Sequence, residues 1–245
     1  MFFHLSNRAI LKISGNDAES FLQSQFSNDI GELNNSSVQL SAYCQHQGKI
    51  LSLFWVIRQA EGFYLSFPAD LLDSIQSRLK MFVIMADVII EDVSMRLAQI
   101  GVLEEKYSSS FRINEKMSLI IIENTDLSSF DIGPNGLWDM ACVDCYLPDV
   151  FLSTTEKFVP QMLNLDINEV GVSFSKGCYP GQEVVARLHY LGSAKRRLFS
   201  FTSDKEMQVG DSLYCHTSKA AKIRGDRYKG SGIVVSKVKY NSLFY

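Results

Sequence analysis

Apolar and polar residues alternate along the first hundred residues in a pattern that predicts a mixture of strands and helices. Residues 8–13 alternate as a strand, and an apolar stripe at helical spacing follows over residues 18–26, after a glycine turn. Residues 39–44 and 50–57 predict a hairpin with a glycine in its turn. Further strands are expected at 63–67, 88–93 and 97–103, and a helix with one apolar face at 71–82.

The second half of the chain predicts less regular structure. Residues 119–122 are typical of a buried strand, and residues 137–147 predict a helix. Residues 148–170 show little periodicity, and so long an irregular stretch inside a compact protein is usually functional. From residue 197 onward, short strands at 198–202, 212–215 and 232–238, separated by turns, predict a small β-barrel.

These patterns predict an α+β fold in three parts. We expect an N-terminal α+β unit over residues 1–105, a second α+β unit over 106–194 and a C-terminal β-barrel over 195–245. The net charge of −3 is unevenly divided, because residues 1–194 carry −10 and residues 195–245 carry +7. The basic C-terminal segment is therefore a candidate for RNA contact, although a solvated face is an equally good interpretation.

Composition narrows the class of protein further. No apolar run approaches the roughly 18 residues of a membrane span, and the first residues lack the features of a signal peptide. The five cysteines form no disulfide framework, so we expect reduced thiols and a cytoplasmic protein without membrane contact.

The run K-G-C-Y-P-G-Q-E, residues 176–183, holds the densest chemistry in the chain. Cys178 stands between two glycines, and nearby cations would favour its thiolate, which is the reactive form of a cysteine. We expect Cys178 to be a functional thiol; a small buried hydrophobe is the alternative. The residues expected to support this loop are Lys176, Gly177, Tyr179, Gly181, Gln182, Glu183 and Arg187.

This run, with the A-R and K-R that follow it, resembles the hallmark of the YgfZ-type folate-binding proteins, which share a fold with the aminomethyltransferase (T-protein) of the glycine cleavage system. Residues 13–23 and 158–174 also resemble parts of that family. The resemblance implies a cloverleaf of the two α+β units and the barrel around a central opening that holds tetrahydrofolate or a one-carbon derivative. It also implies an accessory role in making or repairing iron–sulfur enzymes, including those that modify tRNA, with those enzymes or assembly proteins as partners.

In the aminomethyltransferase fold, an acidic residue shortly before a proline contacts the pterin ring of folate. Asp144, four residues before Pro148, matches that position, so the resemblance implies a folate-binding role for Asp144. Tyr146 stands where the family tends to have glycine, and a tyrosine in a left-handed helix cap would be strained. A surface charge at a helix end is the alternative interpretation of Asp144.

The glycine-cleavage enzymes carry a catalytic aspartate soon after the glycine that corresponds to Gly48, whereas residues 50–53 hold no carboxylate. We therefore expect an accessory protein more than an enzyme, and a folate-dependent aminomethyl or one-carbon transferase is the second hypothesis. A cysteine-nucleophile enzyme with His189 as base is the third. The Cys142-x-x-Cys145 pair is expected to serve packing, and no residue is predicted to bind a metal.

Overall fold

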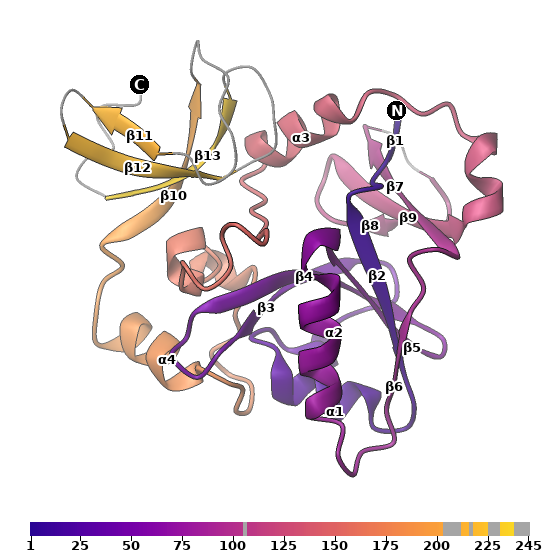
Figure 1. Ribbon diagram of the computed structural model, residues 1–245, viewed down its shortest axis with the longest axis horizontal. Coiled ribbons are helices and arrows are strands. Elements are labelled where there is room, and N and C mark those ends of the chain that lie inside the picture. Colours follow the sequence, from indigo (N-terminus) through magenta and orange to yellow (C-terminus); the bar gives the residue numbers. More distant parts are fainter. Residues whose placement is uncertain (105–106, 203–211, 216–217, 225–230, 238–245) are drawn as a thin grey trace.

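A five-stranded antiparallel sheet forms the centre of the N-terminal half (Figure 1). The computed structural model describes the chain except residues 105–106, 203–211, 216–217, 225–230 and 238–245. The strands follow the order β3-β4-β5-β2-β6, so that β3 and β6 lie at the two edges. Their bounds are β2 Arg8–Ser14, β3 Val38–Cys44, β4 Ile50–Gln59, β5 Gly62–Pro68 and β6 Ile89–Asp92.

Two helices pack on this sheet, α1 (Ala18–Gln25) and α2 (Leu72–Met81). Their apolar stripes enter one core with the sheet, in which the rings of Phe26 and Phe54 stack at a centroid distance of 4.8 Å. The hairpin between β3 and β4 turns at Gly48, whose φ is 72°. Every strand and helix expected in residues 8–103 is therefore confirmed, with bounds shifted by a few residues.

A second antiparallel sheet has the order β1-β7-β9-β8 and joins the start of the chain to residues about a hundred positions later. Helix α3 (Asn135–Asp144) covers it, and its Trp138 lies so close to Gly101 that a side chain on Gly101 would overlap the indole ring. The strands are β1 Phe2–His4, β7 Leu97–Leu103, β8 Phe111–Arg112 and β9 Met117–Glu123. The short strands β1 and β8 were not expected from the sequence.

Residues 145–181 contain only short 3-10 turns, η4 (Pro160–Leu163) and η5 (Ile167–Glu169), in agreement with their lack of periodicity. Helix α4 (Gln182–Tyr190) then follows, although the sequence analysis did not predict a helix there. Helix α3 ends at Asp144, three residues earlier than expected.

The last strands form a third sheet in the order β10-β13-β12-β11 (Figure 1), with bounds β10 Arg196–Thr202, β11 Ser212–Cys215, β12 Ser218–Arg224 and β13 Ser231–Lys237. A closed barrel and the three-part division of the chain remain predictions. The boundary proposed at residue 105 lies between β7 and β8, which belong to the same sheet. Among the described residues, no helix is both long and apolar enough to cross a membrane.

Candidate functional site

The Cys178 loop lies against the β3–β4 turn. Gly181 has a φ of 84° and precedes α4, and a Cβ on Gly181 would lie 2.5 Å from the carbonyl oxygen of Gln45 and 2.8 Å from the Cα of Gly48. Only glycine fits such a close approach of two backbones. Gly177, in contrast, has nothing within 4 Å of the corresponding position, and Cys178 itself is exposed. The thiol side of the loop is therefore open, and the other side is fixed to the hairpin.

Lys176 faces away from this open side. The residue is 7% exposed, and its Nζ donates hydrogen bonds to the carbonyl oxygens of Gln23 at 2.7 Å, Phe26 at 2.5 Å and Asn28 at 2.9 Å. Burial lowers the pKa of the Lys176 ammonium to about 8, and the nearby Asp29 carboxylate raises it in part. The ammonium thus ties the Cys178 loop to the segment that follows α1.

The other predicted loop residues divide into a buried and an exposed group. Tyr179 is buried, and its ring centroid lies 5.4 Å from Nζ of Lys176. Burial raises the pKa of its hydroxyl, which has no hydrogen-bond partner in the part of the chain that the structure describes. Gln182 starts α4 and is half-buried, whereas Glu183 and Arg187 are exposed on that helix. The structure therefore brings Lys176 and Tyr179 together below the loop and leaves the two charges of α4 at the surface.

His189 stacks on the ring of Phe174 at a centroid distance of 3.8 Å. No hydrogen bond or ion pair joins His189 to Cys178 in the structure, so the geometry gives no support to a cysteine–histidine catalytic pair. The described residues also contain no group of three or more histidine, cysteine, aspartate or glutamate side chains placed to hold a metal ion.

Helix α3 ends in a left-handed cap. The N–H of Leu147 donates to the carbonyl oxygen of Cys142, and the N–H of Tyr146 donates to the carbonyl oxygen of Val143. This is a Schellman arrangement, with Tyr146 at φ 52°. The hydroxyl of Tyr146 lies 3.1 Å from that of Ser200 on β10, which helps to hold this strained residue. Tyr146 therefore adopts the left-handed conformation that was expected to be strained for a tyrosine.

The two cysteines at the end of α3, Cys142 and Cys145, and the last residue of the helix, Asp144, lie in different surroundings. Cys142 and Cys145 are partly buried and pack against the core, and burial raises the pKa of the Cys142 thiol. Asp144 is exposed at the last position of α3 and has no hydrogen bond or ion pair with any residue that the structure describes. A role for Asp144 in folate binding remains a prediction.

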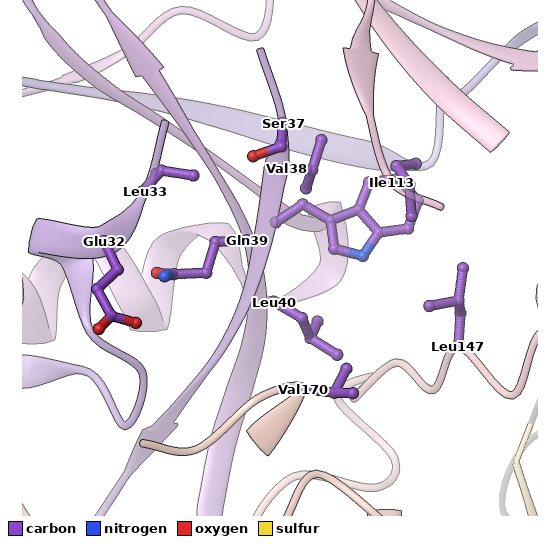
Figure 2. A pocket seen from close by; sticks show the side chains of 10 residues that line it. Glu32, Leu33, Ser37, Val38, Gln39, Leu40, Ile113, Leu147 and Val170 are labelled. Atoms are coloured by element: carbon purple, nitrogen blue, oxygen red, sulfur yellow. The ribbon is translucent and has the colours of Figure 1, made fainter. Parts of the chain in front are cut away.

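A cavity of about 250 Å³ lies at the outer edge of β3 (Figure 2). Apolar side chains from both core clusters line it, together with three polar residues, Glu32, Ser37 and Gln39. The complete lining is Glu32, Leu33, Ser37, Val38, Gln39, Leu40, Trp55, Ile113, Leu147 and Val170. The sequence did not indicate these residues as a site. The alternation of apolar and polar residues in β3 does not show that this strand lies at an edge of the sheet.

The segment at residues 27–29 connects the cavity to the Cys178 loop. Asn28 donates from its side chain to the carbonyl of Leu40 at 2.9 Å, and its own carbonyl accepts from Lys176. One segment therefore contacts both the edge of β3 and the base of the loop.

Comparison with known proteins identifies the family. The chain is 32% identical over 220 residues to an uncharacterized protein of Haemophilus influenzae, a match that covers 86% of this chain and 78% of its relative. It is 29% identical over 234 residues to the tRNA-modifying protein YgfZ of Colwellia psychrerythraea, covering 82% of this chain and 71% of that protein. The YgfZ protein of Vibrio atlanticus is 25% identical over 265 residues, covering 98% and 80% of the two chains. The chain belongs to the YgfZ family.

A solved structure supports the same assignment at the level of the fold. The aminomethyltransferase T of the glycine cleavage system of Bartonella henselae matches with a TM-score of 0.72 and 13% identity, over 98% of this chain and 78% of that one. The expected resemblance to the aminomethyltransferase fold is thereby confirmed for this YgfZ-family chain. No family model matches the sequence.

Proposed function

We propose that this YgfZ-family chain is a cytoplasmic folate-binding accessory protein that supports the synthesis or repair of iron–sulfur enzymes, including enzymes that modify tRNA. Two findings support the proposal: relatives named as tRNA-modifying proteins, and the fold of an aminomethyltransferase of the glycine cleavage system. Residues 50–53 lie within β4 and carry no carboxylate, so the proposal does not include transfer of an aminomethyl group.

The single observation that carries the folate part is the cavity at β3. Its volume of about 250 Å³ is below the roughly 300–1,000 Å³ of pockets that enclose a whole drug-sized ligand. The cavity suits one bicyclic ring, with the remainder of a folate lying outside. Trp55 and the aliphatic side chains supply apolar contact, and Glu32 supplies a carboxylate that has no partner among the described residues. A carboxylate is a good acceptor for the N–H groups of a pterin ring.

The Cys178 loop supplies the second part of the proposal. An exposed thiol beside a glycine with open space around it is accessible to another macromolecule. We assign Cys178 the role of a functional thiol toward an iron–sulfur enzyme or an assembly protein. The basic segment 195–245 is a candidate for RNA contact on the ground of its charge of +7.

Calorimetric titration with tetrahydrofolate tests the folate part. Wild-type protein is expected to bind in the micromolar range, and Ser37→Trp, which places an indole in the cavity, is expected to weaken binding at least tenfold. Ser36→Trp is the matched control, because the exposed Ser36 precedes Ser37 and does not line the cavity. Absence of binding to wild-type protein would overturn the folate proposal, and equal binding by both variants would exclude this cavity.

Complementation tests the accessory role. In a bacterial strain that lacks its own YgfZ protein, the wild-type chain is expected to restore the activity of iron–sulfur enzymes, and Cys178→Ala is expected to fail while remaining folded. Full restoration by Cys178→Ala would show that the thiol has no role.

A further inference from the structure

Three aromatic rings lie together at the end of α4. His189 stacks on Phe174, with 3.8 Å between the ring centroids and 22° between the ring planes. Tyr190 stands at 88° to His189, with its centroid 4.8 Å away. Phe174 is half-buried and packs against the core that contains Trp55, whereas His189 is exposed and Tyr190 is 66% exposed. Phe174 therefore covers one face of the His189 ring, the opposite face is open to solvent, and Tyr190 forms a wall beside it.

Packing of α4 does not account for these exposed rings. Val185 is the buried residue of this helix, and Leu191, which follows the helix, is 83% exposed. Large apolar side chains that gather in one exposed place mark an interaction site. A flat partner on the open face of His189 would extend the existing stack, and proteins commonly hold unpaired nucleic-acid bases on aromatic side chains in this way.

Cations accompany the rings along the chain. Arg187 lies in the last turn of α4, three residues before Tyr190, so the two side chains are neighbours on the helix surface. Lys195 and Arg196 follow where the chain leaves α4 and reaches β10 (Figure 1). All three cations are exposed, and none forms an ion pair or a side-chain hydrogen bond with a residue that the structure describes. They are therefore available to bind phosphate groups.

Two carboxylates near the rings and cations in the fold are already bound. Asp166 pairs with Arg197, with Oδ1 at 2.5 Å from Nη1, and Glu169 accepts the N–H of Phe174 at 3.3 Å. The remaining carboxylate of α4, that of Glu183, lies in the first turn, at the opposite end of the helix from the rings. The end of α4 thus combines an open ring face with unpaired positive charge, which complements the planar bases and the phosphates of a nucleic acid.

We propose that the end of α4 binds single-stranded RNA. An unpaired base stacks on the open face of His189 beside Tyr190, and Arg187 and Lys195 bind the flanking phosphates. Five residues separate Lys195 from Tyr190, so their Cα atoms lie at most about 18 Å apart, within the length of a few nucleotides. The inference rests on the proposed function, which includes RNA contact by residues 195–245, and it places the contact with the bases on α4.

Fluorescence anisotropy with a labelled single-stranded RNA of about 10 nucleotides tests the stacking. Wild-type protein is expected to bind this RNA about fivefold or more tightly than a duplex of the same sequence, because paired bases cannot stack on the rings. His189→Ala and Tyr190→Ala are each expected to weaken binding about fivefold or more. Tyr190→Phe keeps the ring and should change binding less than about twofold.

The salt dependence of the same titration tests the phosphate contacts. Arg187→Ala is expected to lower the slope of log K against log salt by about 0.7, the value for one phosphate contact in a single strand. Lys80→Ala is the matched control, since Lys80 is an exposed cation in the last turn of another helix, α2. Its affinity and its slope should equal those of wild type.

The outcomes separate this inference from the rest of the proposed function. If wild-type protein binds RNA while both alanine variants of the rings bind equally well, or if the duplex binds as tightly as the single strand, the stacking site is wrong and RNA contact by residues 195–245 stands. If wild-type protein binds neither RNA, both RNA proposals fall, and the tetrahydrofolate titration and Cys178→Ala complementation decide the other parts. If His189→Ala fails in complementation while its RNA binding is unchanged, the surface binds a protein partner and the inference is wrong.

Discussion

Lys176 gives the sharpest test of how the Cys178 loop is held. Replacing Lys176 by methionine keeps an unbranched apolar stem, with sulfur in place of one methylene, and removes the ammonium. Three carbonyl oxygens, those of Gln23, Phe26 and Asn28, then lose their donor. Because these carbonyls belong to the segment after α1, the loop and this segment should both loosen.

The magnitude follows from the burial of these bonds. The bonds to Phe26 and Asn28 are buried, and the bond to Gln23 is partly buried and can be replaced by water. A buried acceptor without a donor costs about 1–3 kcal/mol, which gives roughly 2–6 kcal/mol for two. Relief from burying the charge offsets part of this loss. We expect the free energy of unfolding to fall by about 3 kcal/mol, or Tm by roughly 6–12 °C in a chain of this size.

Urea unfolding at pH 7, followed by circular dichroism, measures this loss. Lys195→Met is the matched control, since Lys195 is exposed, and its unfolding free energy should stay within about 0.5 kcal/mol of wild type. A Lys176→Met protein as stable as the Lys195→Met protein would refute the reasoning, because the three hydrogen bonds would then contribute nothing net.

Three further predictions concern the same loop. Gly181→Ala should lower the unfolding free energy by more than 2 kcal/mol or so, since its Cβ would meet backbone at 2.5 Å, whereas Gly177→Ala should be neutral; thermal unfolding of the pair decides this. Iodoacetamide at pH 7 should label the exposed Cys178 and leave Cys44 unmodified, since burial raises the pKa of Cys44 to about 12. Mass spectrometry of tryptic peptides measures both reactions, and modification of Cys44 in the folded protein would contradict the prediction. The pKa of Lys176 is about 8 in the folded protein and ordinarily 10.5. Between pH 8 and pH 10.5, Lys176 therefore carries its proton in the unfolded chain and has lost it in the folded one. Wild-type stability relative to Lys176→Met should therefore rise from pH 8 to 10.5, and a constant difference would argue against a lowered pKa.

The sequence predicts the elements of the first sheet well because their apolar spacing is regular. Residues 18–26 and 71–82 carry one apolar stripe each, and both form helices on the sheet. Helix α4 was missed because residues 182–190 follow directly on the Cys178 motif and only one of their five apolar residues, Val185, is buried, so no apolar stripe marks the helix. Strand β1 has only three residues, too short for any alternation to be visible.

The candidate site was predicted only in part, for a different physical reason. The motif at 176–183 identifies a loop of special chemistry, but the partners of Lys176 lie about 150 residues earlier in the chain, and no local pattern indicates them. The cavity at β3 depends in the same way on tertiary contacts, since Ile113, Leu147 and Val170 line it from later parts of the chain. Local spacing predicts which residues form a strand and does not reveal which later segments line a cavity beside it.

Strand β1 has a consequence for biosynthesis. Phe3 pairs with Gly101 on β7, so these two strands emerge from the ribosome about a hundred residues apart. At about 5–20 residues per second, β1 waits roughly 5–20 s for its partner. All seven residues of β7 are buried in the finished sheet, and β9, its other neighbour, is made later still. Strand β1 therefore stays unpaired on the nascent chain for seconds. A chaperone such as a ribosome-bound holdase would have its greatest effect during this interval.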